Sequence, residues 1–142
     1  MDSEIVEIGM FTTDTNESTK IVKGGEILDL IIKVKHNKAV SDIIVGFTVF
    51  NRLGENMFGV NSYLSGDNLD SDEDESIYKC RFRMPELNEG QYSISPAVAV
   101  GTQHSHIMLH WVYDALVFSV ISPFQQTLPG IIAIQDFNFS NL

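Results

Sequence analysis

The chain has 142 residues, of which 44% are hydrophobic and 20% are charged, and its formal net charge at pH 7 is −10. This composition is typical of one folded domain and excludes a chain that is disordered throughout. The strong negative charge argues against a partner that is itself negative, such as nucleic acid or an anionic lipid surface.

Five segments with alternating apolar and polar residues follow one another along the chain. They are residues 26–35 (EILDLIIKVK), 43–51 (IIVGFTVFN), 57–64 (MFGVNSYL), 76–84 (SIYKCRFRM) and 91–100 (QYSISPAVAV). A period of two over such short segments is typical of half-buried β-strands. Turn-forming residues separate the segments, and no window keeps a helical period for long. The sequence therefore predicts an all-β fold, an immunoglobulin-like antiparallel β-sandwich.

A further segment, residues 104–120 (HSHIMLHWVYDALVFSV), contains the only tryptophan of the chain. Simple alternation divides the segment into two faces, and the more apolar face is that of Trp111. Trp111 is therefore predicted to pack in the core, as most large aromatic side chains do. The alternative is that Trp111, which is close to the strand end, is half exposed and stacks on a sugar. The other face carries His104, His106 and His110 and is predicted to be a polar edge that meets solvent or a ligand.

The residue patterns of metal and nucleotide chemistry do not occur. Zinc needs three or four convergent ligands, and no acidic residue or cysteine is spaced near the histidines to complete such a set. The acidic run at 67–75 hints at a calcium loop, but Glu75 stands where that loop requires glycine and Arg81 where it requires an acid. Phosphate-binding glycine motifs and nucleophile motifs are also missing. The sequence predicts a non-enzymatic domain without metal or cofactor.

Several features are those of an intracellular domain. Cys80 is the only cysteine, so no internal disulfide can form. The apolar runs are too short to span a membrane, and the acidic start of the sequence does not resemble a signal peptide.

The last part of the chain is predicted to be separate from the sandwich. Residues 1–122 form the sandwich, residues 123–130 a linker with prolines at both ends, and residues 131–142 a C-terminal strand. A free apolar strand would be a template for aggregation, so it needs a sheet edge to pair with. We expect the strand to be exchanged between the protomers of a homodimer. The alternative is that it folds back onto its own sheet.

Four segments together resemble a known family. They are GGEILDLIIKVK, IIVGFTVFNRLGENMFGVNS, MPELNEGQYSISPAVAV and LHWVYDALVFSVI, in this order. Their order and spacing resemble the C-terminal domain of the ATP-binding subunit of bacterial O-antigen polysaccharide ABC exporters, the Wzt type. The strongest part is Asn51-Arg52, the turn at Gly54, then Phe58-Gly59 and Asn61. None of these patterns is a catalytic signature.

The resemblance implies a function. It implies an immunoglobulin-like β-sandwich that binds the exported O-polysaccharide glycan at its non-reducing end and couples the finished glycan to ABC-transporter export. It further implies a cytoplasmic location at the inner face of the bacterial inner membrane, with the ATPase domain and the membrane subunit as partners. Because ATPase subunits of such exporters act in pairs, it also favours a homodimer.

A glycan site requires aromatic faces for sugar C–H groups and polar groups for sugar hydroxyls. Small side chains at positions 93, 95, 97 and 99 of one predicted strand face leave room for a ligand there. The predicted glycan contacts are Asn61, Tyr63, Ser93, Ser95, Gln103, His104, His110 and Trp111. The alternative function is a protein–protein interaction or dimerisation sandwich that binds no glycan.

Overall fold

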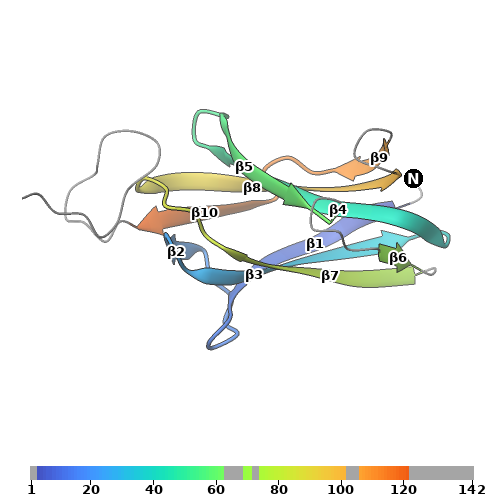
Figure 1. Ribbon diagram of the computed structural model, residues 1–142, viewed down its shortest axis with the longest axis horizontal. Helices are drawn as coiled ribbons and strands as arrows, with labels where there is room; N and C mark the ends of the chain where they lie inside the picture. Colours follow the sequence, from blue (N-terminus) through green and yellow to red (C-terminus); the bar gives the residue numbers. More distant parts are fainter. Residues whose placement is uncertain (1–2, 63–68, 72–73, 102–105, 122–142) are drawn as a thin grey trace, which may run out of the picture.

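The computed structural model describes residues 3–62, 69–71, 74–101 and 106–121, which form two packed β-sheets (Figure 1). The small sheet consists, in order, of β1 (Ser3–Thr12), β3 (Ile27–His36) and β7 (Asp74–Arg83). The large sheet consists, in order, of β2 (Ile21–Lys23), β10 (Leu116–Ile121), β8 (Gly90–Gly101), β4 (Val40–Asn51) and β5 (Asn56–Asn61). In addition, β6 (Leu69–Ser71) pairs with β4, and β9 (His106–Trp111) pairs with β8. Within the described residues, no helix is long and apolar enough to cross a membrane.

The predicted all-β sandwich is confirmed. The five alternating segments are β3, β4, β5, β7 and β8, with ends that differ from the prediction by up to three residues. Strands β1 (Ser3–Thr12), β2 (Ile21–Lys23) and β6 (Leu69–Ser71) were not predicted from the sequence. In β1 the alternation is interrupted by a register shift between Ile5 and Glu7 where it pairs with β3, and β2 and β6 have only three residues each. The predicted linker at 123–130 and the strand at 131–142 lie outside the described residues.

The sheets are antiparallel except for one pair of strands. The central pair, β4 and β8, is antiparallel from Ile43 opposite Val100 to Asn51 opposite Tyr92. Strand β10 is antiparallel to β8 but parallel to β2. This departs from the purely antiparallel prediction. It is possible because β2 and β10 are distant in the chain, so that no hairpin imposes their direction.

The core lies between the two sheets and is built from the inward-facing residues of alternating strands. The four apolar residues of β3 that alternation places on one face are each at most 2% exposed: Leu28, Leu30, Ile32 and Val34. Phe47 of β4 contacts Phe58 and Phe82, so its ring joins the two sheets. Phe118 of β10 stacks on Tyr92 of β8 with ring centroids 5.8 Å apart. Burial of these large apolar surfaces is the main stabilising contribution to the fold.

A buried histidine joins all three strands of the small sheet. His36 is only 2% exposed. Its Nδ1 is 2.8 Å from Ser3 Oγ of β1, and its Nε2 is 3.2 Å from the Tyr78 hydroxyl of β7. Burial lowers the pKa of the His36 imidazole below its ordinary value, because the cation would lose its hydration. His36 therefore serves as a neutral, hydrogen-bonded part of the interior.

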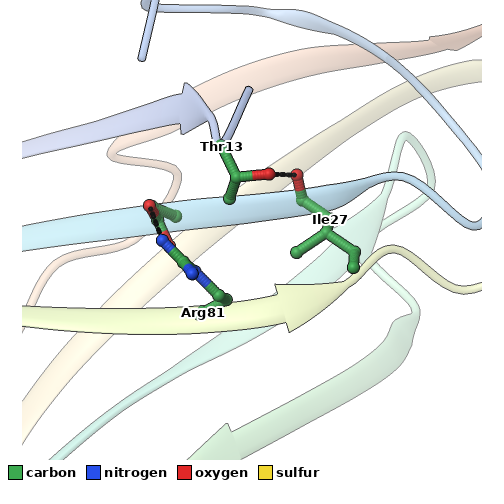
Figure 2. Close-up of polar contacts among 4 residues, drawn as sticks. Thr13, Ile27 and Arg81 are labelled. Atoms are coloured by element: carbon green, nitrogen blue, oxygen red, sulfur yellow. Dashed lines mark hydrogen bonds and ion pairs between the residues drawn. The ribbon is translucent and has the colours of Figure 1, made fainter. Parts of the chain in front are cut away.

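The outer face of the small sheet carries an ion pair between facing residues of β3 and β7. Arg81 Nε and one terminal nitrogen donate to the two carboxylate oxygens of Asp29 at 2.9 and 3.1 Å. Figure 2 shows Arg81 beside a second contact, in which the Thr13 hydroxyl donates to the Ile27 carbonyl at 3.3 Å. The Arg81 guanidinium lowers the pKa of the Asp29 carboxyl, since it stabilises the charged form.

Candidate functional site

A row of residues crosses the outer face of the large sheet on four adjacent strands. Gly46 of β4 is opposite Asn61 of β5 on one side and Ala97 of β8 on the other, and Ala97 is opposite Trp111 of β9. Adjacent strands lie about 4.8 Å apart, so the row from Asn61 to Trp111 spans about 14 Å. The two smallest side chains therefore lie in the middle, between an amide at one end and an indole ring at the other.

Glycine at position 46 is required by the close approach of β5. A Cβ atom at this position would lie 2.6 Å from the Val60 carbonyl oxygen and 2.7 Å from the Asn61 Cβ. Gly59 of β5 has the same constraint, because its Cβ would lie 2.9 Å from the Phe47 carbonyl oxygen. A glycine inside a strand often marks such a close backbone approach. Because Gly46 and Gly59 carry no side chain, the surface of the sheet is recessed at these positions.

The residues around this row enclose a hollow of about 220 Å³, called the first hollow below. It is lined by Ile44, Gly46, Phe47, Thr48, Gly59, Val60, Asn61, Ala97, Ala99, His106, Met108 and Trp111. No aspartate, glutamate, lysine or arginine is among these described residues, although the whole chain carries a net charge of −10. The hollow offers an aromatic ring, a thioether, an amide, a hydroxyl and the imidazole of His106. Such a surface is suited to a neutral ligand with both C–H and hydroxyl groups.

The prediction that Trp111 packs in the core is wrong, and the alternative of a half-exposed ring is correct. Trp111 is 36% exposed and lines the first hollow. The reason is a register shift between β8 and β9: Val98 is opposite His110, but the next residue, Ala99, is opposite Met108. Leu109 is thus an extra residue on β9, a β-bulge. A bulge reverses the alternation beyond it, so Met108 and Trp111 share one face although they are three positions apart.

The bulge also corrects the prediction for His110. This residue is opposite Val98, whose side chain is buried in the core, so His110 faces inward. Its Nδ1 accepts a hydrogen bond from the Ile5 backbone N–H at 2.8 Å. An imidazole nitrogen that accepts such a bond is unprotonated, so the proton of neutral His110 is on Nε2. His110 connects β9 to β1 and does not line the first hollow.

The two predicted serine contacts hold the turn after β9. The Asp114 backbone N–H donates to Ser95 Oγ at 2.9 Å, and Ser93 Oγ donates to the Asp114 carboxylate at 2.6 Å. Asp114 has a φ of 51°, a left-handed conformation that aspartate tolerates better than most residues. Ser95 is 0% exposed, so the prediction that it contacts a glycan is wrong. Ser93 is half-buried, and its contact with a glycan stays a prediction.

The remaining predicted contacts have different outcomes. Asn61 lies in the first hollow, where its contact with a ligand stays a prediction. Tyr63, Gln103 and His104 lie outside the described residues. Sequence reasoning missed Met108, Thr48 and Gly46. A glycine within the strand pattern at 43–51 was the available signal for the last of these.

Metal ligands do not gather in the described part of the chain. Across those residues, no group of three or more histidine, cysteine, aspartate or glutamate side chains is arranged to hold a metal ion.

The fold and the first hollow define a class of protein: an immunoglobulin-like β-sandwich with an open hollow on the outer face of one sheet. Within that class, the chain belongs to the Wzt C-terminal domain family, whose family model matches residues 2–134. A solved structure described as the "Crystal structure of the C-terminal domain of wzt" is similar, with a TM-score of 0.84 and 19% sequence identity. The match covers 99% of this chain and 84% of that chain. No curated protein matches this chain in sequence.

Proposed function

We propose that this domain binds the O-polysaccharide exported by an ABC transporter, at its non-reducing end and without cleaving it. The observation that carries the proposal is the half-exposed Trp111 ring beside a floor of glycine and alanine in the first hollow. Membership of the Wzt C-terminal domain family supports the exporter context. Binding would couple the finished glycan to its transport.

The first hollow has the groups that sugar recognition requires. An indole ring offers a face against which the C–H groups of a pyranose can pack, and such contacts gain energy from the ring electrons. Asn61 and Thr48 offer amide and hydroxyl groups to sugar hydroxyls. The absence of aspartate, glutamate, lysine and arginine among the described lining residues fits a neutral sugar. Because the site is shallow and accessible to water, we expect dissociation constants on the order of micromolar to millimolar.

The proposal places the domain in the cytoplasm, at the inner face of the inner membrane, beside the ATPase domain and the membrane subunit of the exporter. It also includes a homodimer in which the strand at 131–142 is exchanged between protomers. Truncation after Ser122 followed by light scattering tests the exchange. A truncated chain that stays a stable dimer would place the dimer interface elsewhere.

Calorimetric titration of the full chain with O-polysaccharide from the bacterium that encodes it tests glycan binding. We expect saturable binding that Trp111→Ala weakens by about tenfold or more, because the indole ring would supply most of the apolar contact with the sugar. Ile107→Ser is the matched control: Ile107 is 69% exposed on the same strand but does not line the first hollow. Equal affinity of the Trp111→Ala variant and the wild type would refute this site. Binding to a protein partner alone would favour the interaction-module function.

A further inference from the structure

A second hollow lies on the same outer face of the large sheet, further along β8. Its volume is about 370 Å³. It is lined by Phe50, Asn51, Arg52, Gly54, Gln91, Tyr92, Ser93, Tyr113, Asp114 and Val117. Its floor follows the strand register, with Ser93 of β8 opposite Phe50 of β4 and Val117 of β10. Ser93 is four residues from Ala97, the floor of the first hollow, so the two floors lie about 13 Å apart along the strand.

An aromatic pair connects the two hollows. Trp111 lines the first hollow and Tyr113 the second, and their ring centroids are 5.5 Å apart at an interplanar angle of 41°. Tyr113 is 73% exposed, a high value for a tyrosine that also contacts another ring. The two aromatic rings lie side by side, and strand β8 runs under both hollows. Such an arrangement is suited to binding successive units of a polymer.

The wall beside Tyr113 carries a carboxylate in a fixed position. One carboxylate oxygen of Asp114 accepts the hydrogen bond of Ser93, and the Asp114 backbone is held by Ser95. No contact among the described residues occupies the other carboxylate oxygen, which is therefore available to accept a hydrogen bond from a ligand hydroxyl. The carboxylate is exposed to solvent at the edge of the second hollow.

Another wall comes from the turn between β4 and β5, which carries Arg52. The Asn51 side-chain oxygen accepts hydrogen bonds from the backbone N–H groups of Leu53 and Glu55, each at 2.9 Å. These bonds order the turn and so restrict where Arg52 can reach. The second hollow thus combines a guanidinium donor, a carboxylate acceptor, the Gln91 amide and a tyrosine ring. Arg52 contributes one positive charge and Asp114 one negative charge, so the charges of the described lining cancel. This favours a ligand that is polar but carries no strong net charge.

We infer that the second hollow is a subsite for a further sugar of the same glycan, so that the domain recognises an oligosaccharide segment lying along β8. The inference rests on the proposed function and extends it from one sugar to several. Tyr113 packs against a sugar face, Asp114 accepts a sugar hydroxyl and Arg52 donates to sugar oxygens. The aromatic pair holds the two sugars in one orientation relative to each other.

Calorimetric titration with fragments of the O-polysaccharide of graded length, from one sugar upward, tests the inference. We expect fragments long enough to cover both floors to bind about tenfold more tightly than the shortest fragment that binds. Tyr113→Ser and, independently, Arg52→Ala should remove this gain and leave the affinity for the shortest fragment within about twofold. Arg52 is included because the Tyr113 variant also removes a neighbour of Trp111.

The control is Leu53→Ser, which changes a 78% exposed residue of the same turn that does not line the second hollow. It should bind long and short fragments like the wild type. Equal affinity of the wild type for long and short fragments, or full retention of the gain in both variants, would overturn the subsite while leaving glycan binding at Trp111 intact. A wild-type chain that binds no fragment at all would overturn both.

Discussion

The outer faces of the two sheets have the same strand geometry but different surface chemistry. On the small sheet, charged side chains face each other across strands: Lys33 lies 3.0 Å from Glu75 and 4.0 Å from Glu7, and Arg81 pairs with Asp29. On the large sheet, the same positions of the pleat hold glycine, alanine and threonine beside Trp111. Cross-strand ion pairs are an ordinary way to complete a solvated face. Small residues beside an exposed ring leave an open volume on the large sheet, and this difference is why the proposed glycan site lies there.

The largest effect on stability and binding is expected from Gly46→Val, which puts a branched side chain into the floor of the first hollow. The new Cβ would overlap the β5 backbone, so β5 must move away. We expect a loss of about 1–3 kcal/mol in the free energy of unfolding, the usual effect of overpacking, and no detectable glycan binding. Urea denaturation and calorimetric titration measure the two effects. Ala97→Ser, a small change in the same row, should retain both stability and binding.

A smaller effect is expected on the opposite face, where Arg81→Met removes the partner of Asp29. The pKa of Asp29 is held low by Arg81, so the ion pair stabilises the fold above the unfolded-state pKa of about 3.8 and stops doing so as the pH falls through the lower folded-state pKa. The variant should therefore be less stable than the wild type at pH 7 and similar to it in strong acid. Denaturation curves at both pH values measure this. Weakened glycan binding in this variant would contradict the assignment of function to the large sheet alone.

A comparable effect, in a higher pH range, is expected from His36, which is buried between the two sheets. Its pKa is lowered in the fold from an ordinary value of 6.5, so the unfolded chain takes up a proton at a higher pH than the folded chain. Stability is therefore full above about pH 6.5 and decreases as the pH falls from there towards the lower folded-state pKa. His36→Gln, which keeps a hydrogen-bonding side chain without this titration, should show a flatter stability profile between pH 7 and pH 5. An identical slope in both proteins would show that other groups cause it.

The smallest effect is expected from salt on glycan binding. Because no aspartate, glutamate, lysine or arginine is among the described lining residues of the first hollow, raising the salt concentration from about 50 to 500 mM should change the affinity for a neutral glycan by less than about twofold. Titrations at the two concentrations measure this. A strong salt dependence would contradict binding of a neutral glycan.

Much of the fold follows from local pattern. The apolar row of β3 is buried as alternation predicts, because side chains of a strand point to opposite sides whatever its partners are. The small residues at 97 and 99 of β8 were likewise placed on the correct outer face, since no bulge interrupts the pairing of β8 with β4. Sequence alone therefore determined an all-β sandwich, the core residues of its central strands, and the face of β8 that carries the small residues.

The parts that only the tertiary structure decided are those that depend on a partner strand. The bulge at Leu109 arises from how β9 pairs with β8, and it moves Trp111 to the outer face and His110 to the inner one. Ser95 looked available in the sequence, but it is buried because the turn at Asp114 folds over it and takes its hydroxyl. Gly46 borders the hollow because β5 passes so close to β4. Alternation is a property of one strand, whereas register, bulges and covering turns are set by pairs of segments that the chain brings together only on folding.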